Sequence, residues 1–293
     1  MPGGREQQSA DPSSAVRAYY ESNTRLFLAL GIGRQTLAIR RAVWADGVES
    51  LADAVNYVNR LVAAEARLRA GAMTDGELRI LDIGCGVGGS LLFLAGALGA
   101  PLKGTGVTIS PRQAAIARRQ ARIQGLSAKC SFIAADFARL TGLPLFHLAF
   151  AIESFVHFTA SAAFFAAAAG SIVPGGRLMI IDDFLARARH SRKERGLVNA
   201  FRQGWLLPSL CTVGRAVQSG AECGMRLVED RDLSLFLSQS PLSSRVAGWA
   251  VRVMRALPVS WPYWRSTVGS IALEACRRAG LVEYHVLVFE RQA

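Results

Sequence analysis

Four short runs of the sequence carry side chains suited to holding a charged small molecule and reacting with it. Asp82–Gly86 is a carboxylate followed by a glycine-rich turn, and Thr108–Pro111 is a polar turn that introduces a helix. Asp136 stands beside an aromatic ring, and Glu153 precedes His157 by four residues. Glycine lets a ligand approach the backbone closely, and a carboxylate or an imidazole can accept a proton or stabilise positive charge. These runs therefore predict a binding site with acid–base chemistry.

Each run follows an apolar segment of strand length, and the carboxyl ends of parallel strands bring such runs together. Ser110 and Pro111 are suited to cap and start a helix. Strands that alternate with helices predict an α/β fold with a doubly wound, mostly parallel sheet. The expected strands are residues 78–83, 103–109, 130–134, 145–152, 177–182 and 284–289, and the expected helices between them are 90–98, 111–124 and 160–172.

The spacing of apolar residues divides the chain into segments. Residues 1–13 are polar and are expected to form a disordered tail, and residues 14–77 repeat apolar side chains every three or four positions, as in a helical cap. The strand–helix core is expected at 78–185 and 271–293. Residues 186–270 lose the strand pattern, so we expect a helical insertion that covers the carboxyl edge of the sheet as an acceptor lid.

The composition is that of a folded protein with a large core, because 51% of the 293 residues are hydrophobic and 19% are charged. The formal charge of +12 favours anionic partners. The cysteines have neither metal-ligand nor disulfide spacing, so we expect a cytoplasmic location and no metal site. We also expect no signal peptide and no membrane span.

Two classes of ligand compete for the glycine-rich turn, because it also fits the G-x-G-x-x-G pattern of dinucleotide-binding proteins. Asp82 would repel a pyrophosphate but suits a ligand with an ammonium and a sulfonium group. The run Gly104–Ser110 has no carboxylate for a nicotinamide ribose, and Thr108 is its nearest polar substitute. Asp136 can accept a hydrogen bond from an exocyclic amine while Phe137 packs on an adenine ring. These residues favour S-adenosylmethionine over a nicotinamide cofactor.

The order of the motifs strengthens that interpretation. D-x-G-x-G-x-G, G-V-T-I-S-P-x-Q, A-D-F and P-G-G follow one another at the predicted strand ends. Between residues 78 and 184 the chain resembles the class I S-adenosylmethionine-dependent methyltransferases, which implies a Rossmann-like sheet of seven strands. The resemblance implies a methionine end lined by Asp82, Gly84 and Gly86, a ribose near Thr108, and an adenine held by Asp136 and Phe137. The other expected cofactor-binding residues are Cys85, Ile109, Gln113 and Glu153.

The segment Ile152–His157 indicates the acceptor chemistry. Its I-E-S-x-x-H pattern resembles the sterol, tocopherol and prenyl-diphosphate carbon methyltransferases. Methyl transfer to an alkene carbon leaves a carbocation, which a carboxylate in an apolar pocket stabilises before a proton is lost. We therefore expect Glu153 to be the general base or the cation stabiliser, and His157 to orient Glu153 or to accept the proton. The predicted function is C-methylation of an isoprenoid-like small molecule in specialised metabolism.

Several side chains outside the motifs are candidates for the acceptor pocket. Arg34, Arg40 and Arg41 would suit a diphosphate, so we expect an apolar acceptor with or without phosphate. The Glu153 segment lacks the base-binding tetrad of nucleic-acid amine methyltransferases, which argues against nucleic acid as a partner. The candidate acceptor-binding residues are Tyr19, Tyr20, Arg41, Trp44 and Trp205.

Two other functions remain open. An N- or O-methyltransferase of an amine, phenol, quinol or polyketide would need only an aligned lone pair, with Glu153 as a positioning group. A non-catalytic protein of the same fold, or a membrane-surface binder that uses the basic run 187–195, is the other alternative. Weak association with a lipid surface is also compatible with an apolar acceptor. Glu153 and the aromatic residues have structural interpretations as well, as a helix cap and as core side chains.

Overall fold

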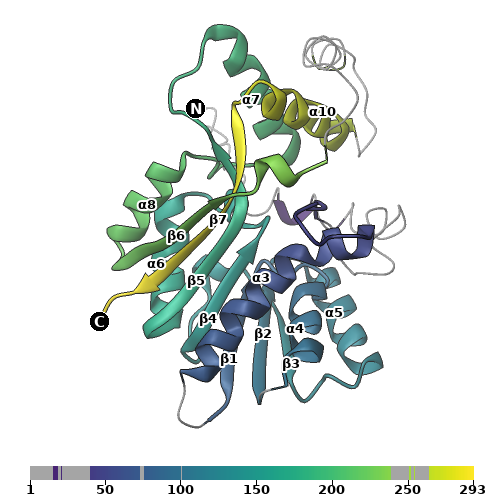
Figure 1. Cartoon of the computed structure of the whole chain (residues 1–293), viewed down its shortest axis with the longest axis vertical. Helices are drawn as coiled ribbons and strands as arrows, with labels where there is room; N and C mark the ends of the chain where they lie inside the picture. Colours follow the sequence, from purple (N-terminus) through teal and green to yellow (C-terminus); the bar gives the residue numbers. More distant parts are fainter. Residues whose placement is uncertain are drawn as a thin grey trace, which may run out of the picture.

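The centre of the molecule is a seven-stranded sheet with the strand order β3-β2-β1-β4-β5-β7-β6. β1 to β5 are parallel, and β7 lies antiparallel between β5 and β6 (Figure 1). The predicted fold, a doubly wound and mostly parallel sheet of seven strands, is confirmed. The computed structural model describes residues 16–18, 21, 40–72, 76–99, 101–238, 251, 254 and 264–293.

The elements follow the predicted order, and most boundaries agree within a few residues. The strands are β1 (Leu78–Ile83), β2 (Leu102–Thr108), β3 (Cys130–Ala134), β4 (Phe146–Ile152), β5 (Ile172–Leu185), β6 (Met225–Asp232) and β7 (Val282–Arg291). The helices are α3 (Leu51–Gly71), α4 (Gly89–Ala97), α5 (Pro111–Ile123), α6 (Ser161–Ser171), α7 (Arg192–Trp205), α8 (Val213–Ala221) and α10 (Trp264–Arg278). Short 3-10 turns are η1 (Phe137–Arg139), η2 (Phe155–His157) and η3 (Ser234–Phe236).

Helices cover both faces of the sheet, so the strands are apolar on both sides. Ile80 and Leu81 are neighbours in β1 and are both fully buried, but they belong to different core clusters. Ile80 packs in the cluster with α3, α4 and α5, and Leu81 packs in the cluster with α6, α7, α8 and α10. Figure 1 shows α3, α4 and α5 together on one side of the sheet.

Local signals position α5, which carries one of the predicted site residues. The Ser110 side chain accepts a hydrogen bond from the backbone N–H of Gln113 at 3.1 Å, and Pro111 occupies the first turn. This cap satisfies one of the free N–H groups at the helix start. As a result, Gln113 is fixed beside the end of β2.

The segment 186–270 differs from its prediction as a helical insertion. Its described part contains α7 and α8, but Met225–Asp232 is a strand that pairs with β7. The strand pattern is weak there because β6 is an edge strand, and most of its side chains are partly or fully exposed. β6 and α8 therefore belong to the sheet domain, whereas the lid function of the segment remains a prediction.

The residues just before α3 are hydrogen-bonded to the segment that follows the edge strand β6. Val43 forms an isolated bridge with Leu237, and the Trp44 backbone N–H donates to the Phe236 carbonyl at 2.6 Å. This attachment brings residues 40–44 to the carboxyl ends of the strands. The predicted tail at residues 1–13 and most of the predicted cap before residue 40 lie outside the described residues. In the part of the chain that the structure describes, no helix is long and apolar enough to cross a membrane.

Candidate functional site

The main cavity lies where the strand order reverses between β1 and β4, the usual ligand position in doubly wound sheets. Together with the solvent space at its open mouth, it encloses about 1210 Å³. Every predicted cofactor-binding residue lines this cavity: Asp82, Gly84, Cys85, Gly86, Thr108, Ile109, Gln113, Asp136, Phe137 and Glu153.

The glycine-rich turn leaves β1 and forms the floor of the cavity. The backbone N–H groups of Gly84 and Cys85 both donate to the Val107 carbonyl at 2.9 Å, which fixes the turn against β2. Gly84 and Gly86 have φ values of 81° and 53°, a region that side chains other than glycine rarely adopt. A Cβ on Gly84 would also lie 2.4 Å from the Ser154 Cβ. The turn therefore requires glycine at position 84 for two reasons.

Asp82 and Arg40 both line the cavity and both retain unpaired polar atoms. Asp82 is 3% exposed, and its Oδ2 has no hydrogen-bond partner among the described residues. Burial raises the pKa of Asp82 to about 8, although the charge of Arg40 opposes that rise. Arg40 donates through Nη1 to Asn59 and Ser90, each at 2.8 Å, whereas its Nε and Nη2 remain unpaired in the described structure. A carboxyl group and a guanidinium, both with unused hydrogen-bonding atoms, therefore share one cavity.

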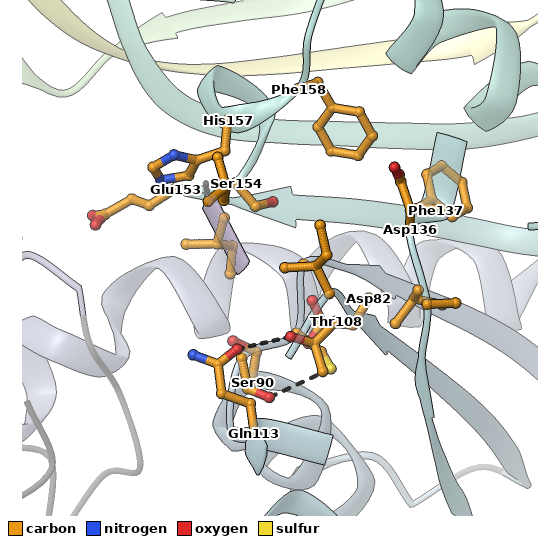
Figure 2. Close-up of a pocket in the computed structure, with 18 of the residues that line it drawn as sticks. Asp82, Ser90, Thr108, Gln113, Asp136, Phe137, Glu153, Ser154, His157 and Phe158 are labelled. Carbon is orange, nitrogen blue, oxygen red and sulfur yellow. Dashed lines mark hydrogen bonds between the residues drawn. The ribbon is translucent and has the colours of Figure 1, made fainter. Parts of the chain in front are cut away.

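The middle and the far end of the cavity come from β2, β3 and the turns after them. Thr108 Oγ1 donates to Gln113 Oε1 at 2.7 Å (dashed in Figure 2). Asp136 Oδ1 accepts a hydrogen bond from the Ala138 N–H at 3.1 Å, and Phe137 is buried against Phe158 with ring centroids 6.2 Å apart. Asp136 and Phe137 follow β3 and Asp82 lies in β1, two strands that β2 separates, so these residues line different parts of the cavity.

Glu153 is held at the end of β4 by groups from distant parts of the chain. Its Oε1 accepts hydrogen bonds from the Tyr284 hydroxyl at 3.0 Å and from the Arg41 backbone N–H at 3.1 Å. Sequence reasoning missed Tyr284, because it lies near the start of the buried strand β7 and belongs to none of the motifs. The Arg41 side chain forms a two-pronged ion pair with Asp183, which is itself 2% exposed.

His157 lines the same cavity as Glu153, but its ring is anchored to the backbone. Nδ1 lies 3.0 Å from the Leu206 carbonyl, and a carbonyl can only accept, so Nδ1 carries the proton in that contact. Burial lowers the pKa of His157 to about 4. The imidazole is therefore neutral at pH 7 and is a weak base, and its predicted role as a proton acceptor remains a prediction.

Three of the predicted acceptor-binding residues lie outside the lining of the cavity. Arg41 turns its guanidinium towards Asp183, and Trp44 is 40% exposed. Trp205 packs against the core where α7 approaches α10, and a Cβ on Gly269 would lie 2.6 Å from its Cδ1. Their predicted role in acceptor binding remains a prediction. Tyr19 and Tyr20 lie outside the described residues, although nearby Val16 does line the cavity.

Binding of a metal ion would need a cluster of suitable ligands. In the described ranges, no group of three or more His, Cys, Asp or Glu side chains is placed to hold one.

Comparisons with known proteins agree with this geometry. Residues 80–176 match a family model described as a methyltransferase domain. The chain is 33% identical over 145 residues to a chloroplastic tocopherol O-methyltransferase from Arabidopsis thaliana, and the match covers 46% of this chain and 40% of that relative. The chain thus spans less than half of that relative's length.

Two solved structures share the fold across nearly the whole chain. The [4+2]-cyclase SpnF has a TM-score of 0.72 and 22% identity, covering 97% of this chain and 98% of that one. Geranyl diphosphate C-methyltransferase from Streptomyces coelicolor A3(2), in complex with Mg²⁺, geranyl diphosphate and S-adenosyl-L-homocysteine, has a TM-score of 0.66 and 16% identity. That match covers 98% of this chain and 100% of the other. At these identities the likeness establishes the fold alone.

The chain therefore carries a class I methyltransferase domain, whose cofactor is S-adenosylmethionine. Its similar proteins include tocopherol and sterol methyltransferases, the subgroup that the sequence motifs indicated, and also O-methyltransferases outside that subgroup.

Proposed function

We propose that this protein transfers a methyl group from S-adenosylmethionine to an sp² carbon of an apolar, isoprenoid-like small molecule. The observation that carries the proposal is the carboxylate of Glu153, held at a strand end by two hydrogen-bond donors, with Ile152 and Phe158 lining the cavity nearby. A fixed negative charge at that place suits a reaction that creates positive charge on carbon.

The unpaired atoms around the glycine-rich turn fit the methyl donor. The amino-acid end of S-adenosylmethionine carries an ammonium and a carboxylate. Asp82 Oδ2 is a buried acceptor, and Nε and Nη2 of Arg40 are buried donors, and all three lack partners among the described residues. Because buried polar groups are nearly always hydrogen-bonded in a working state, we assign the ammonium to Asp82 and the carboxylate to Arg40.

Glu153 would then stabilise the positive charge on the acceptor and remove its proton. When bound, S-adenosylmethionine supplies an electrophilic methyl group from its sulfonium. Glu153 stabilises the carbocation on the acceptor through charge, and its Oε2, which has no hydrogen-bond partner among the described residues, can take up the proton that is lost. Ile152 and Phe158 line the cavity nearby and would help to exclude water from the cation.

The charges of the lining favour a neutral acceptor over a diphosphate. Asp82, Asp136 and Glu153 line the cavity, and Arg40 is the basic side chain among the described lining residues. Arg41, which had suggested a diphosphate, is committed to Asp183 and Glu153. A diphosphate near the reacting carbon would meet mainly negative charge, so we place an unphosphorylated alkene or prenylated compound first.

O-methylation is the second candidate, because a curated relative is a tocopherol O-methyltransferase. In that reaction the acceptor oxygen already has a lone pair, so alignment suffices and Glu153 would only position the hydroxyl.

Methyl transfer is tested with S-adenosylmethionine labelled with ¹³C in the methyl group. Wild-type protein is incubated with terpenoid alkenes, prenylated aromatics, prenyl diphosphates, phenols and amines, and NMR locates the label in any product. The proposal predicts a new carbon–carbon bond, and a loss of at least about 100-fold in rate for Glu153→Gln with donor affinity unchanged. A labelled oxygen or nitrogen, with Glu153→Gln fully active, would establish the second candidate instead. Because a [4+2]-cyclase shares the fold, donor binding without any labelled product would argue against both.

A further inference from the structure

Glu153 occupies a strained backbone position at the cavity. Its φ is 49°, in the left-handed region, which is a strained conformation for a residue other than glycine. Its N–H donates to the Ile181 carbonyl at 2.8 Å, so the strained residue is tied to β5. Strain of this kind persists only where surrounding contacts fix the conformation. The contacts of the Glu153 carboxylate and of its partners supply that constraint.

Both donors to Glu153 Oε1 belong to groups that are themselves fixed. Tyr284 is 1% exposed, and the Arg41 guanidinium lies over its ring at 4.8 Å from the centroid. The same guanidinium donates two hydrogen bonds to the Asp183 carboxylate. Three segments that are far apart in the sequence, residues 40–41, β5 and β7, thus meet around one carboxylate.

The protonation states of these groups are consistent with a donor network. Burial, followed by the negative charge of Glu153, raises the pKa of Tyr284 well above its usual value, so the phenol keeps its proton. Burial acts to lower the pKa of Arg41, but Asp183 and Glu153 outweigh it and raise that pKa, so the guanidinium stays charged. Burial and the neighbouring Asp183 raise the pKa of Asp182, which keeps it neutral. The Arg41 guanidinium thus lies between the carboxyl groups of Asp183 and Glu153.

We propose that Tyr284, together with Arg41 and Asp183, positions Glu153 so that Oε1 is held by two donors and only Oε2 is presented to the acceptor. This inference rests on the proposed function, and it adds the residues that fix the hydrogen bonding and orientation of the Glu153 carboxylate. Tyr284 and Arg41 act through Glu153, and so they are positioning residues rather than catalytic ones.

Tyr284→Phe tests the proposal because it removes one hydroxyl and keeps the ring under Arg41. Tyr57→Phe is the matched control, since Tyr57 is a partly buried tyrosine in α3 that lies near Arg60 rather than in this network. Both variants are compared with wild type as full-length protein saturated with S-adenosylhomocysteine. The probe is the ¹³Cδ resonance of Glu153 in glutamate-labelled protein, assigned by its loss in Glu153→Gln.

The proposal predicts that this resonance changes its chemical shift in Tyr284→Phe at pH 7, because the Glu153 carboxylate loses a hydrogen-bond donor. Tyr57→Phe should leave the chemical shift unchanged, and S-adenosylhomocysteine affinity should stay within twofold in both variants. An unchanged Glu153 resonance in Tyr284→Phe would overturn the proposal. If Tyr284→Phe fails to fold, the ¹³Cζ resonance of Tyr284 in the tyrosine-labelled wild type replaces it: the proposal requires this resonance to shift in Glu153→Gln, and no shift would overturn it. Neither readout needs an acceptor, so failure here is distinct from failure of methyl transfer.

Discussion

The carboxylate of Asp82 and the guanidinium of Arg40 line one cavity, and each buries polar atoms that have no partner among the described residues. The two residues come from opposite sides of α3 in the sequence, one before the helix and one at the end of β1. Their arrangement is complementary to a ligand that carries an ammonium and a carboxylate. Several measurable consequences arise from this pair and from the residues around it.

Asp82 should make donor binding depend on pH. In the free protein its pKa is raised to about 8 by burial, so at pH 6 it is mainly protonated. An ammonium ligand favours the carboxylate, so binding releases a proton and affinity should rise up to about tenfold per pH unit from pH 6 towards pH 8. Above that range the ligand's own amino group, with a pKa of about 7.7–8.0, loses its charge.

Calorimetry with S-adenosylmethionine in two buffers of different ionisation enthalpy measures the released proton directly. Asp82→Asn should bind at least about tenfold more weakly at pH 8, because a hydrogen bond to a charged group is lost. The affinity of this variant should also no longer rise between pH 6 and pH 8. An affinity that is flat between pH 6 and pH 8 in wild type would contradict the assignment of the ammonium.

Arg40 should recognise the carboxylate of the donor. Arg40→Met is expected to weaken S-adenosylmethionine binding by about tenfold or more, since a charge-assisted contact contributes roughly 1.5–3 kcal/mol. It should leave 5′-methylthioadenosine, which lacks the amino-acid carboxylate, bound as in wild type. Arg60→Met, in α3 and 41% exposed, is the matched control. Equal weakening of both ligands by Arg40→Met would show that Arg40 supports the fold of the cavity instead.

The glycine-rich turn predicts a graded response to alanine. Gly86→Ala meets no atom within 4 Å, so it should lose about 1–2 kcal/mol for a left-handed residue with a side chain. Gly84→Ala adds a clash with Ser154, so its loss should exceed that of Gly86→Ala by about 1–3 kcal/mol. Urea unfolding of the two variants measures the free energies. A smaller loss for Gly84→Ala would mean that the turn moves away from Ser154 at little cost.

His157 should destabilise the fold in acid. Its pKa is lowered to about 4 by burial, against about 6.5 when unfolded. Between these values the unfolded chain binds more protons, so the stability from this group is complete above pH 6.5 and falls as the pH drops to 4, by about 3 kcal/mol.

The variant His157→Asn keeps a donor for Leu206 and removes the titration. Urea unfolding at pH 7 and pH 5 should therefore show a smaller acid loss in this variant than in wild type. The same acid loss in both proteins would assign the effect to other groups.

The motifs made most of the fold and the donor site predictable, because their constraints are local. A turn such as Gly84–Gly86 requires glycine whatever surrounds it, and Ser110 caps α5 within three residues. The strand β6 escaped prediction because its edge position leaves polar side chains exposed.

The partners of Glu153 could not be predicted in the same way. Arg41 lies 112 residues before it and Tyr284 lies 131 residues after it. Only the pairing of β7 with β5, a long-range feature, brings Tyr284 to the site. A tyrosine in a buried strand gives no sign in the sequence that its hydroxyl reaches a carboxylate.

Calorimetric titration of the wild-type chain with S-adenosylhomocysteine and, separately, with NAD bears most directly on the ligand of the cavity. Recognition of the ligand's ammonium by Asp82 predicts one S-adenosylhomocysteine bound per chain, weakened at least about tenfold in Asp82→Asn, and no binding of NAD. Binding of NAD at the glycine-rich turn, with no heat from S-adenosylhomocysteine, would contradict this prediction.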